Sequence, residues 1–143
     1  MLADLHGIAV YRAPLGQDLR ETVSGAFLRH ATVGAAILIN GETTPGRQQF
    51  TLAHELAHAL FHTESWYVGF FGRRERDERF ADEFASEFLV PVQSLRGVVE
   101  TIGLPKVEDP AVVVYLQRLF RVSWAMMLVR LQAANLVSSA GLE

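Results

Sequence analysis

The chain has 143 residues, of which 50% are hydrophobic and 20% charged, a formal net charge of −3 and no cysteine. The length fits a single domain with its own core, and the lack of cysteine excludes disulfides and thiolate metal sites. The negative charge argues against nucleic acid as the main partner. No apolar run approaches the roughly 18 residues that span a bilayer, and the N-terminus lacks a signal-peptide pattern, so we expect a cytoplasmic protein without a membrane anchor.

The N-terminal part of the chain is predicted to form a small β-sheet. Residues 1–6 resemble the end of a helix that stops at Gly7. Three segments rich in β-branched and aliphatic residues follow, at residues 8–11, 24–29 and 32–39, and Asn40-Gly41 supplies the turn after them. Segments of this length are typical of strands, and we expect them to pair in a mostly antiparallel sheet.

Helical periodicity replaces this pattern after Gly41. Thr43-Thr44-Pro45 is a typical helix start, with a hydroxyl cap and a proline in the first turn. A later helix ends before Pro91 and is expected to bury an apolar stripe made of Phe80, Ala81, Phe84, Ala85 and Phe88. The expected helices cover residues 46–63, 73–89, 92–102, 110–120 and 124–135. The chain is therefore predicted to be one α+β domain over residues 1–143, with the sheet packed on the first helix and a helical C-terminal part.

The first helix carries the sequence His54-Glu55-Leu56-Ala57-His58, an H-E-x-x-H motif. Residues four apart on a helix differ by about 40° in azimuth and about 6 Å along the axis, so two imidazoles at this spacing can converge on one metal ion. Glu55 lies beside them and can act as a general base on a water at that metal. A chance polar pattern on a surface helix is the alternative, but leucines 52, 56 and 60 form a stripe on the opposite face.

A catalytic zinc site takes three protein ligands and keeps one position open for water. His62 is the nearest further candidate, but it lies about 12 Å from His54 along the helix axis, too far for both to bind one ion. His62 and Tyr67 are instead candidates for an auxiliary group beside the oxyanion. For His62, a packing role at the helix end is the alternative.

The second helix offers carboxylates for the third position. Glu78 lies twenty residues after His58, and Asp82 lies one turn further along the same face. The first can bind the metal while the second accepts the free N–H of a ligand histidine. Spacing alone does not distinguish these residues from a solvated acidic face, because Asp77, Glu83 and Glu87 are acidic too.

The two motifs together are similar to those of the gluzincins, the thermolysin-like zinc peptidases. The wider sequence resembles the ImmA/IrrE family of metallopeptidases over nearly the whole chain. Residues 47–58 resemble that family's active-site helix, residues 78–91 its second motif, and residues 119–123 with Arg130-Leu131 its C-terminal signature. The resemblance implies that one Zn²⁺ is bound per chain by His54, His58 and Glu78. By analogy with the gluzincins, Asp82 would bond His54.

The resemblance also implies a function. It predicts a cytoplasmic, zinc-dependent endopeptidase that acts on a protein or peptide, such as a transcriptional repressor of the helix-turn-helix type. Family members are also fused to such repressors, so we expect either a stand-alone member or a region excised from a longer chain. The alternative is a peptidase-like sensor or regulatory domain that binds zinc and a protein partner without turnover. Glu55 argues for the enzyme, because a structural zinc site needs no carboxylate beside an open position.

The C-terminal helices suggest a further alternative, because residues 116–131 resemble a helix-turn-helix. Residues 124–129 are strongly apolar, however, and Arg118, Arg121 and Arg130 are a thin basic complement for phosphates. We therefore expect these helices to pack against the rest of the domain and not to bind nucleic acid directly.

Overall fold

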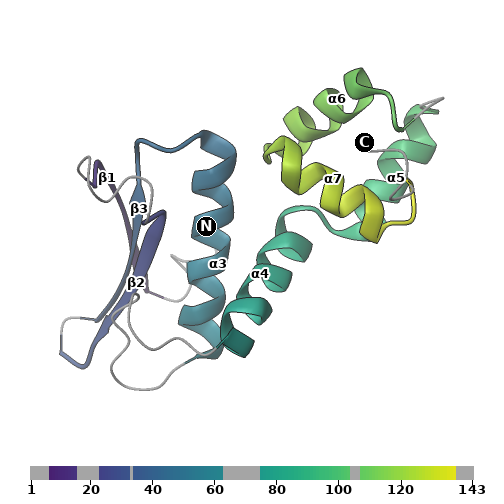
Figure 1. Ribbon diagram of the computed structural model, residues 1–143. Coiled ribbons are helices and arrows are strands. Elements are labelled where there is room, and N and C mark those ends of the chain that lie inside the picture. Colours follow the sequence, from purple (N-terminus) through teal and green to yellow (C-terminus); the bar gives the residue numbers. More distant parts are fainter. Residues whose placement is uncertain (1–6, 16–22, 33, 63–74, 104–106, 138–143) are drawn as a thin grey trace. The chain divides into compact units, whose positions relative to one another are not determined.

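The computed structural model describes residues 7–15, 23–32, 34–62, 75–103 and 107–137. The chain divides into two compact units, Met1–Ala85 and Ser86–Glu143. A three-stranded sheet at the N-terminal end is followed by helices (Figure 1), which confirms the expected α+β class. The single domain expected over residues 1–143 stays a prediction, and the helix end expected at residues 1–6 lies outside the described residues.

The sheet is built from β1 (Ile8–Ala13), β2 (Gly25–His30) and β3 (Gly34–Asn40), in the spatial order β1-β3-β2. The pairing of β2 with β3 is antiparallel, whereas that of β1 with β3 is parallel. The sheet is therefore mixed, not mostly antiparallel as the short strands suggested. β3 lies in the middle because it is the most apolar strand, and this position pairs its backbone groups on both edges.

Helix α3 (Pro45–Phe61) covers one face of the sheet (Figure 1). Its leucine stripe forms the core of the first unit together with the inward-facing side chains of the strands. The buried members of that core are Ile8, Phe27, Ile37, Ile39, Leu56 and Ala59, and Leu52 and Leu60 pack against them. The helix begins with Pro45 in its first turn, as expected, but Thr44 at the cap position makes no side-chain capping bond. The Gln48 side chain instead donates to the carbonyls of Gly41 and Thr43.

The other helices begin and end close to the predicted positions. They are α4 (Glu75–Leu89), α5 (Val92–Ile102), α6 (Pro110–Phe120) and α7 (Trp124–Ala133). The side chains of Asp109 and Ser123 cap α6 and α7 by accepting from the backbone N–H groups of Ala111 and Met126. The apolar stripe of α4 is narrower than expected, because Ala81 and Ala85 are fully buried while Phe80 and Phe88 are 40% and 48% exposed.

The second unit is held together by an apolar core and two arginines. Leu95, Leu116, Met127 and Leu131 are fully buried. Buried Arg130 donates from Nε to the carbonyl of Val90 at 2.8 Å and forms an ion pair with Glu87. Arg96 donates from two nitrogens to the carbonyl of Ala134. Both arginines thus satisfy backbone carbonyls at or beyond helix ends.

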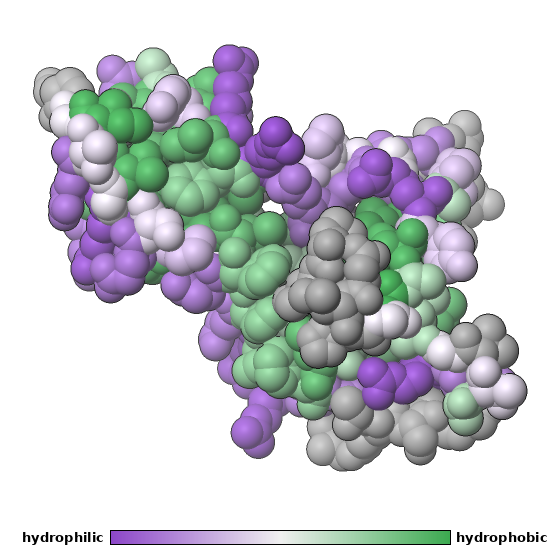
Figure 2. Space-filling view, turned by 180° about the vertical axis from the view of Figure 1, so that it is seen from behind, coloured by the Kyte–Doolittle hydropathy of each residue, from purple (hydrophilic) through white to green (hydrophobic). Residues whose placement is uncertain are grey.

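Hydrophobic residues also reach the surface of both units (Figure 2). The large exposed hydrophobic residues on α6, on α7 and at the C-terminal end of α5 are Ile102, Tyr115, Leu119, Trp124 and Val129. Among the residues that the structure describes, no single helix is long and apolar enough to cross a membrane. Only α6 and α7, bent by 100° where they meet, pass that test as a pair on length and composition.

Candidate metal centre

Two imidazoles of α3 face each other across one turn of the helix. Nε2 of His54 lies 3.1 Å from Nε2 of His58, and the ring centroids are 4.8 Å apart. The four-residue spacing produces this arrangement, because it stacks the two side chains on one face of the helix. The His58 side chain is fully buried, and that of His54 is 13% exposed.

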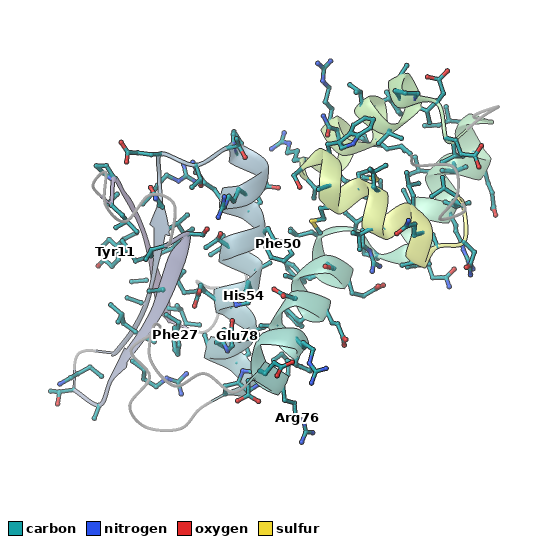
Figure 3. All side chains as sticks on the ribbon, viewed as in Figure 1. Tyr11, Phe27, Phe50, His54, Arg76 and Glu78 are labelled. Atoms are coloured by element: carbon teal, nitrogen blue, oxygen red, sulfur yellow. The ribbon has the colours of Figure 1, made fainter. Side chains whose placement is uncertain are left out.

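Helix α4 brings a carboxylate to the same point. Oε2 of Glu78 is 3.3 Å from Nε2 of His54, and Oε1 is 3.2 Å from Nε2 of His58. Figure 3 shows His54 and Glu78 extending toward each other from α3 and α4. Of the acidic residues on α4, Glu78 is thus the one that the fold brings to both rings, a choice that the spacing in the sequence left open.

The three side chains fit a metal ion. One ligand atom from each lies within 4.8 Å of the others. Zinc with nitrogen and oxygen ligands at about 2.0–2.1 Å in a tetrahedron separates its ligand atoms by about 3.3 Å. The two Nε2 atoms are 3.1 Å apart, and each lies 3.2 or 3.3 Å from one of the two oxygens of Glu78, which is close to that separation. Two neutral imidazoles and one carboxylate are also a donor set that zinc prefers. The group can therefore hold a metal ion.

Asp82 lies behind His54, one helical turn after Glu78. Its Oδ1 is 2.8 Å from Nδ1 of His54. Because a carboxylate only accepts, a neutral His54 ring in this contact has its proton on Nδ1 and its lone pair on Nε2. The contact is the one predicted for Asp82, and its role in orienting His54 stays a prediction.

Glu55 is almost completely buried, with 3% of its surface exposed. It lies near Gly25 of β2, where the strand comes close to α3. A Cβ atom at Gly25 would be 2.3 Å from Cγ2 of Thr51 and 3.7 Å from Cγ of Glu55. Glycine at this position therefore lets the strand come close to the part of the helix that carries Glu55.

Of the two residues predicted as auxiliary groups, His62 and Tyr67, the structure describes only His62. Tyr67 lies outside the described residues. His62 lies at the end of α3, where its Nδ1 is 2.9 Å from Nδ1 of His58 and its Nε2 is 3.6 Å from Oδ1 of Asp77. Sequence reasoning did not connect His62 to these partners. Its four-residue spacing from His58 could have signalled the first contact, whereas Asp77 lies on α4 and no spacing within α3 predicts it.

The comparisons with known proteins agree with this centre. Residues 3–132 match the family model of the IrrE N-terminal-like domain, a peptidase family. The chain belongs to this family. The match covers both units, and it includes the H-E-x-x-H motif of α3 and the acidic residues of α4. A comparison with curated proteins gives no match.

The IrrE-like family and the geometry lead to the same coarse statement. The chain is a metallopeptidase-like domain in which His54, His58 and Glu78 can hold a metal ion. The role of each site residue stays a prediction.

Proposed function

We propose that this chain is a zinc-dependent endopeptidase that acts in the cytoplasm. One zinc ion per chain would be bound by Nε2 of His54, Nε2 of His58 and a carboxylate oxygen of Glu78. The single observation that carries the proposal is the convergence of two imidazoles and one carboxylate from two helices. The two Nε2 atoms lie 3.1 Å apart, and each lies 3.2–3.3 Å from one oxygen of the Glu78 carboxylate. Family membership supplies independent support for peptidase chemistry.

Zinc bound at such a site lowers the pKa of a water toward about 7 and polarises a carbonyl group. In our proposal Glu55 takes a proton from the water that attacks the peptide carbonyl. It returns that proton to the leaving amine nitrogen, so that cleavage yields a carboxylate and an amine. Its burial supports this role, because a carboxylate shielded from bulk water interacts more strongly with the groups that face it.

The substrate we propose is an extended segment of a regulatory protein, such as a helix-turn-helix repressor, as the resemblance to the ImmA/IrrE family implies. An extended peptide can add to a free sheet edge through backbone hydrogen bonds. Within the described residues β2 pairs only with β3, and the close approach at Gly25 brings β2 beside Glu55. β2 is therefore the strand along which we expect the peptide to lie.

We do not propose direct DNA binding for α6 and α7. The exposed side chains there include Tyr115, Leu119, Trp124 and Val129, whereas a recognition helix presents polar and basic groups to the bases and phosphates. The alternative that we keep is a regulatory domain that binds zinc and a protein partner without turnover, because it would use the same three ligands.

The experiment that separates enzyme from regulator is Glu55→Gln. Gln has nearly the same volume but cannot accept the proton, so the variant should keep its zinc and fold and lose about 10²–10⁴-fold or more in cleavage rate. Cleavage of a repressor from the same cell is followed by mass spectrometry, with Glu83→Gln as the control because Glu83 is an exposed acid of α4. Equal cleavage by wild type and zinc-loaded Glu55→Gln contradicts the mechanism. If neither cleaves but wild type still changes the repressor's occupancy on DNA, the regulatory alternative is favoured.

A further inference from the structure

The third histidine of α3 lies behind one of the proposed zinc ligands. Nδ1 of His62 is 2.9 Å from Nδ1 of His58, whereas the other ring nitrogen of His58, Nε2, faces Glu78. His62 therefore contacts His58 through the nitrogen that is not available to the metal.

The hydrogen positions on these two rings follow from the metal centre. A neutral imidazole carries one proton, so one nitrogen donates and the other offers a lone pair. For Nε2 of His58 to bind zinc, its proton must lie on Nδ1, from which it is donated to Nδ1 of His62. His62 then carries its own proton on Nε2, the nitrogen nearest to Oδ1 of Asp77 at 3.6 Å. The carboxylate thus faces the positive end of the N–H dipole.

Burial makes these contacts effective. The His58 side chain is fully buried, while those of His62 and Asp77 are 18% and 27% exposed. Water therefore competes weakly for Nδ1 of His58, and the bond to His62 can hold this ring in place. The same logic applies on the other side of the centre, where Asp82 holds Nδ1 of His54.

We propose that His62 is a positioning residue for the zinc ligand His58 and that Asp77 in turn orients His62. Each ligand histidine would then have its own hydrogen-bond acceptor outside the metal centre, Asp82 for His54 and His62 for His58. The inference rests on the proposed zinc centre. It assigns His62 a role through His58 and not through direct contact with substrate.

Two substitutions of His62 distinguish its role as a hydrogen-bond acceptor from the packing of its ring. His62→Phe keeps a ring next to Phe80, whose centroid is 5.6 Å from that of His62, but removes the acceptor. His62→Asn loses the ring and places a carboxamide oxygen near the position of Nδ1. Competition with a chromophoric chelator then measures zinc affinity in the full chain. We expect His62→Phe to weaken it by about 10–100-fold and His62→Asn to stay close to wild type.

The inference is overturned if His62→Asn binds zinc more weakly than His62→Phe. It is also overturned if a folded His62→Phe binds zinc as tightly as wild type. If wild type binds zinc and only these comparisons fail, the proposed centre stands and the positioning role does not. If wild type itself takes up no zinc, the proposed centre fails and the inference falls with it. Asp77→Asn should weaken zinc binding less than His62→Phe, and Glu83→Gln serves as the control for lost charge on α4.

A spectroscopic measurement tests the proton assignment directly. Long-range ¹H–¹⁵N spectra of the zinc-loaded protein with ¹⁵N-labelled histidine distinguish the two neutral tautomers of each ring. We expect His58 with its proton on Nδ1 and His62 with its proton on Nε2. A zinc-loaded protein in which His62 carries its proton on Nδ1 contradicts the inference, because that nitrogen could no longer accept from His58.

Discussion

Oδ1 of Asp82 lies 2.8 Å from Nδ1 of His54, and the nitrogen on the other side of the same ring lies 3.3 Å from Glu78. The two carboxylates are four residues apart on α4, and this spacing of one helical turn lets Asp82 contact Nδ1 and Glu78 contact Nε2 of the same imidazole. Helix α4 therefore supplies both the third group of the proposed metal centre and the carboxylate that is predicted to orient one of its ligands. Loss of either carboxylate should be visible in zinc binding.

Removal of the Asp82 acceptor should weaken zinc binding without abolishing it. Asp82→Ala frees the His54 ring to rotate and to change its tautomer, and such a loss typically costs about 10–100-fold in metal affinity or activity. Asp82→Asn should have a smaller effect, because the amide oxygen still accepts a hydrogen bond. Zinc affinity by chelator competition checks both, and an unchanged affinity in Asp82→Ala would show that the contact does not orient the ring.

Removal of the third ligand should have a larger effect. Glu78→Ala leaves two imidazoles, fewer than the three protein ligands that a catalytic zinc site uses. We expect elemental analysis after dialysis to find substoichiometric zinc in this variant and full occupancy in wild type. The matched control is Glu83→Ala on the same helix. Full zinc occupancy in Glu78→Ala would mean that another residue is the third ligand.

Gly25→Ala should destabilise the first unit. The new Cβ would lie 2.3 Å from Cγ2 of Thr51 and 2.8 Å from the carbonyl oxygen of Leu38, and overpacking of this kind costs about 1–3 kcal/mol. Chemical denaturation measures the free energy of unfolding. Gly97→Ala is the control, because nothing lies within 4 Å of a Cβ at that helical position.

A second substitution checks the cause of that loss. Thr51→Ser removes Cγ2, so the double variant Gly25→Ala/Thr51→Ser should recover part of the stability that Gly25→Ala loses. No recovery would indicate that the Leu38 carbonyl, and not Thr51, limits the approach of β2 to α3. Stability of Gly25→Ala equal to that of wild type would contradict the close packing itself.

Substitution of Arg130 should destabilise the second unit more than substitution of an exposed arginine. Arg130→Met keeps the apolar length of the side chain but leaves the buried carbonyl of Val90 without its donor. Hydrogen bonds that involve a charged group contribute about 1.5–3 kcal/mol, so we expect a loss of stability of that order in denaturant unfolding. Arg118→Met, at an exposed position on α6, should change the free energy of unfolding by less than about 0.5 kcal/mol. Similar losses in the two variants would contradict the structural role of Arg130.

The features that depend on neighbours along the chain can be predicted from the sequence alone. The positions of the strands and helices follow from local periodicity, from Pro45, Asp109 and Ser123 at helix starts, and from Pro91 at a helix end. The pairing of His54 with His58 is local as well, because a helix places residues four apart on one face whatever surrounds it. For this reason the motif was recognisable before any fold was known.

Contacts between groups far apart in the chain depend on how the helices and strands pack. Fully buried Ala81 and Ala85 form the contact stripe of α4, and Phe61 packs against Phe80 and Phe84 with ring centroids 5.2 and 5.5 Å apart. This packing sets the rotation of α4 in the first unit and so turns Glu78, and not another acid, toward both histidines. The parallel pairing of β1 with β3 and the contact of His62 with Asp77 also depend on the packing of distant segments. Such contacts depend on the packing of segments far apart in the chain, which spacing within one helix or strand does not specify.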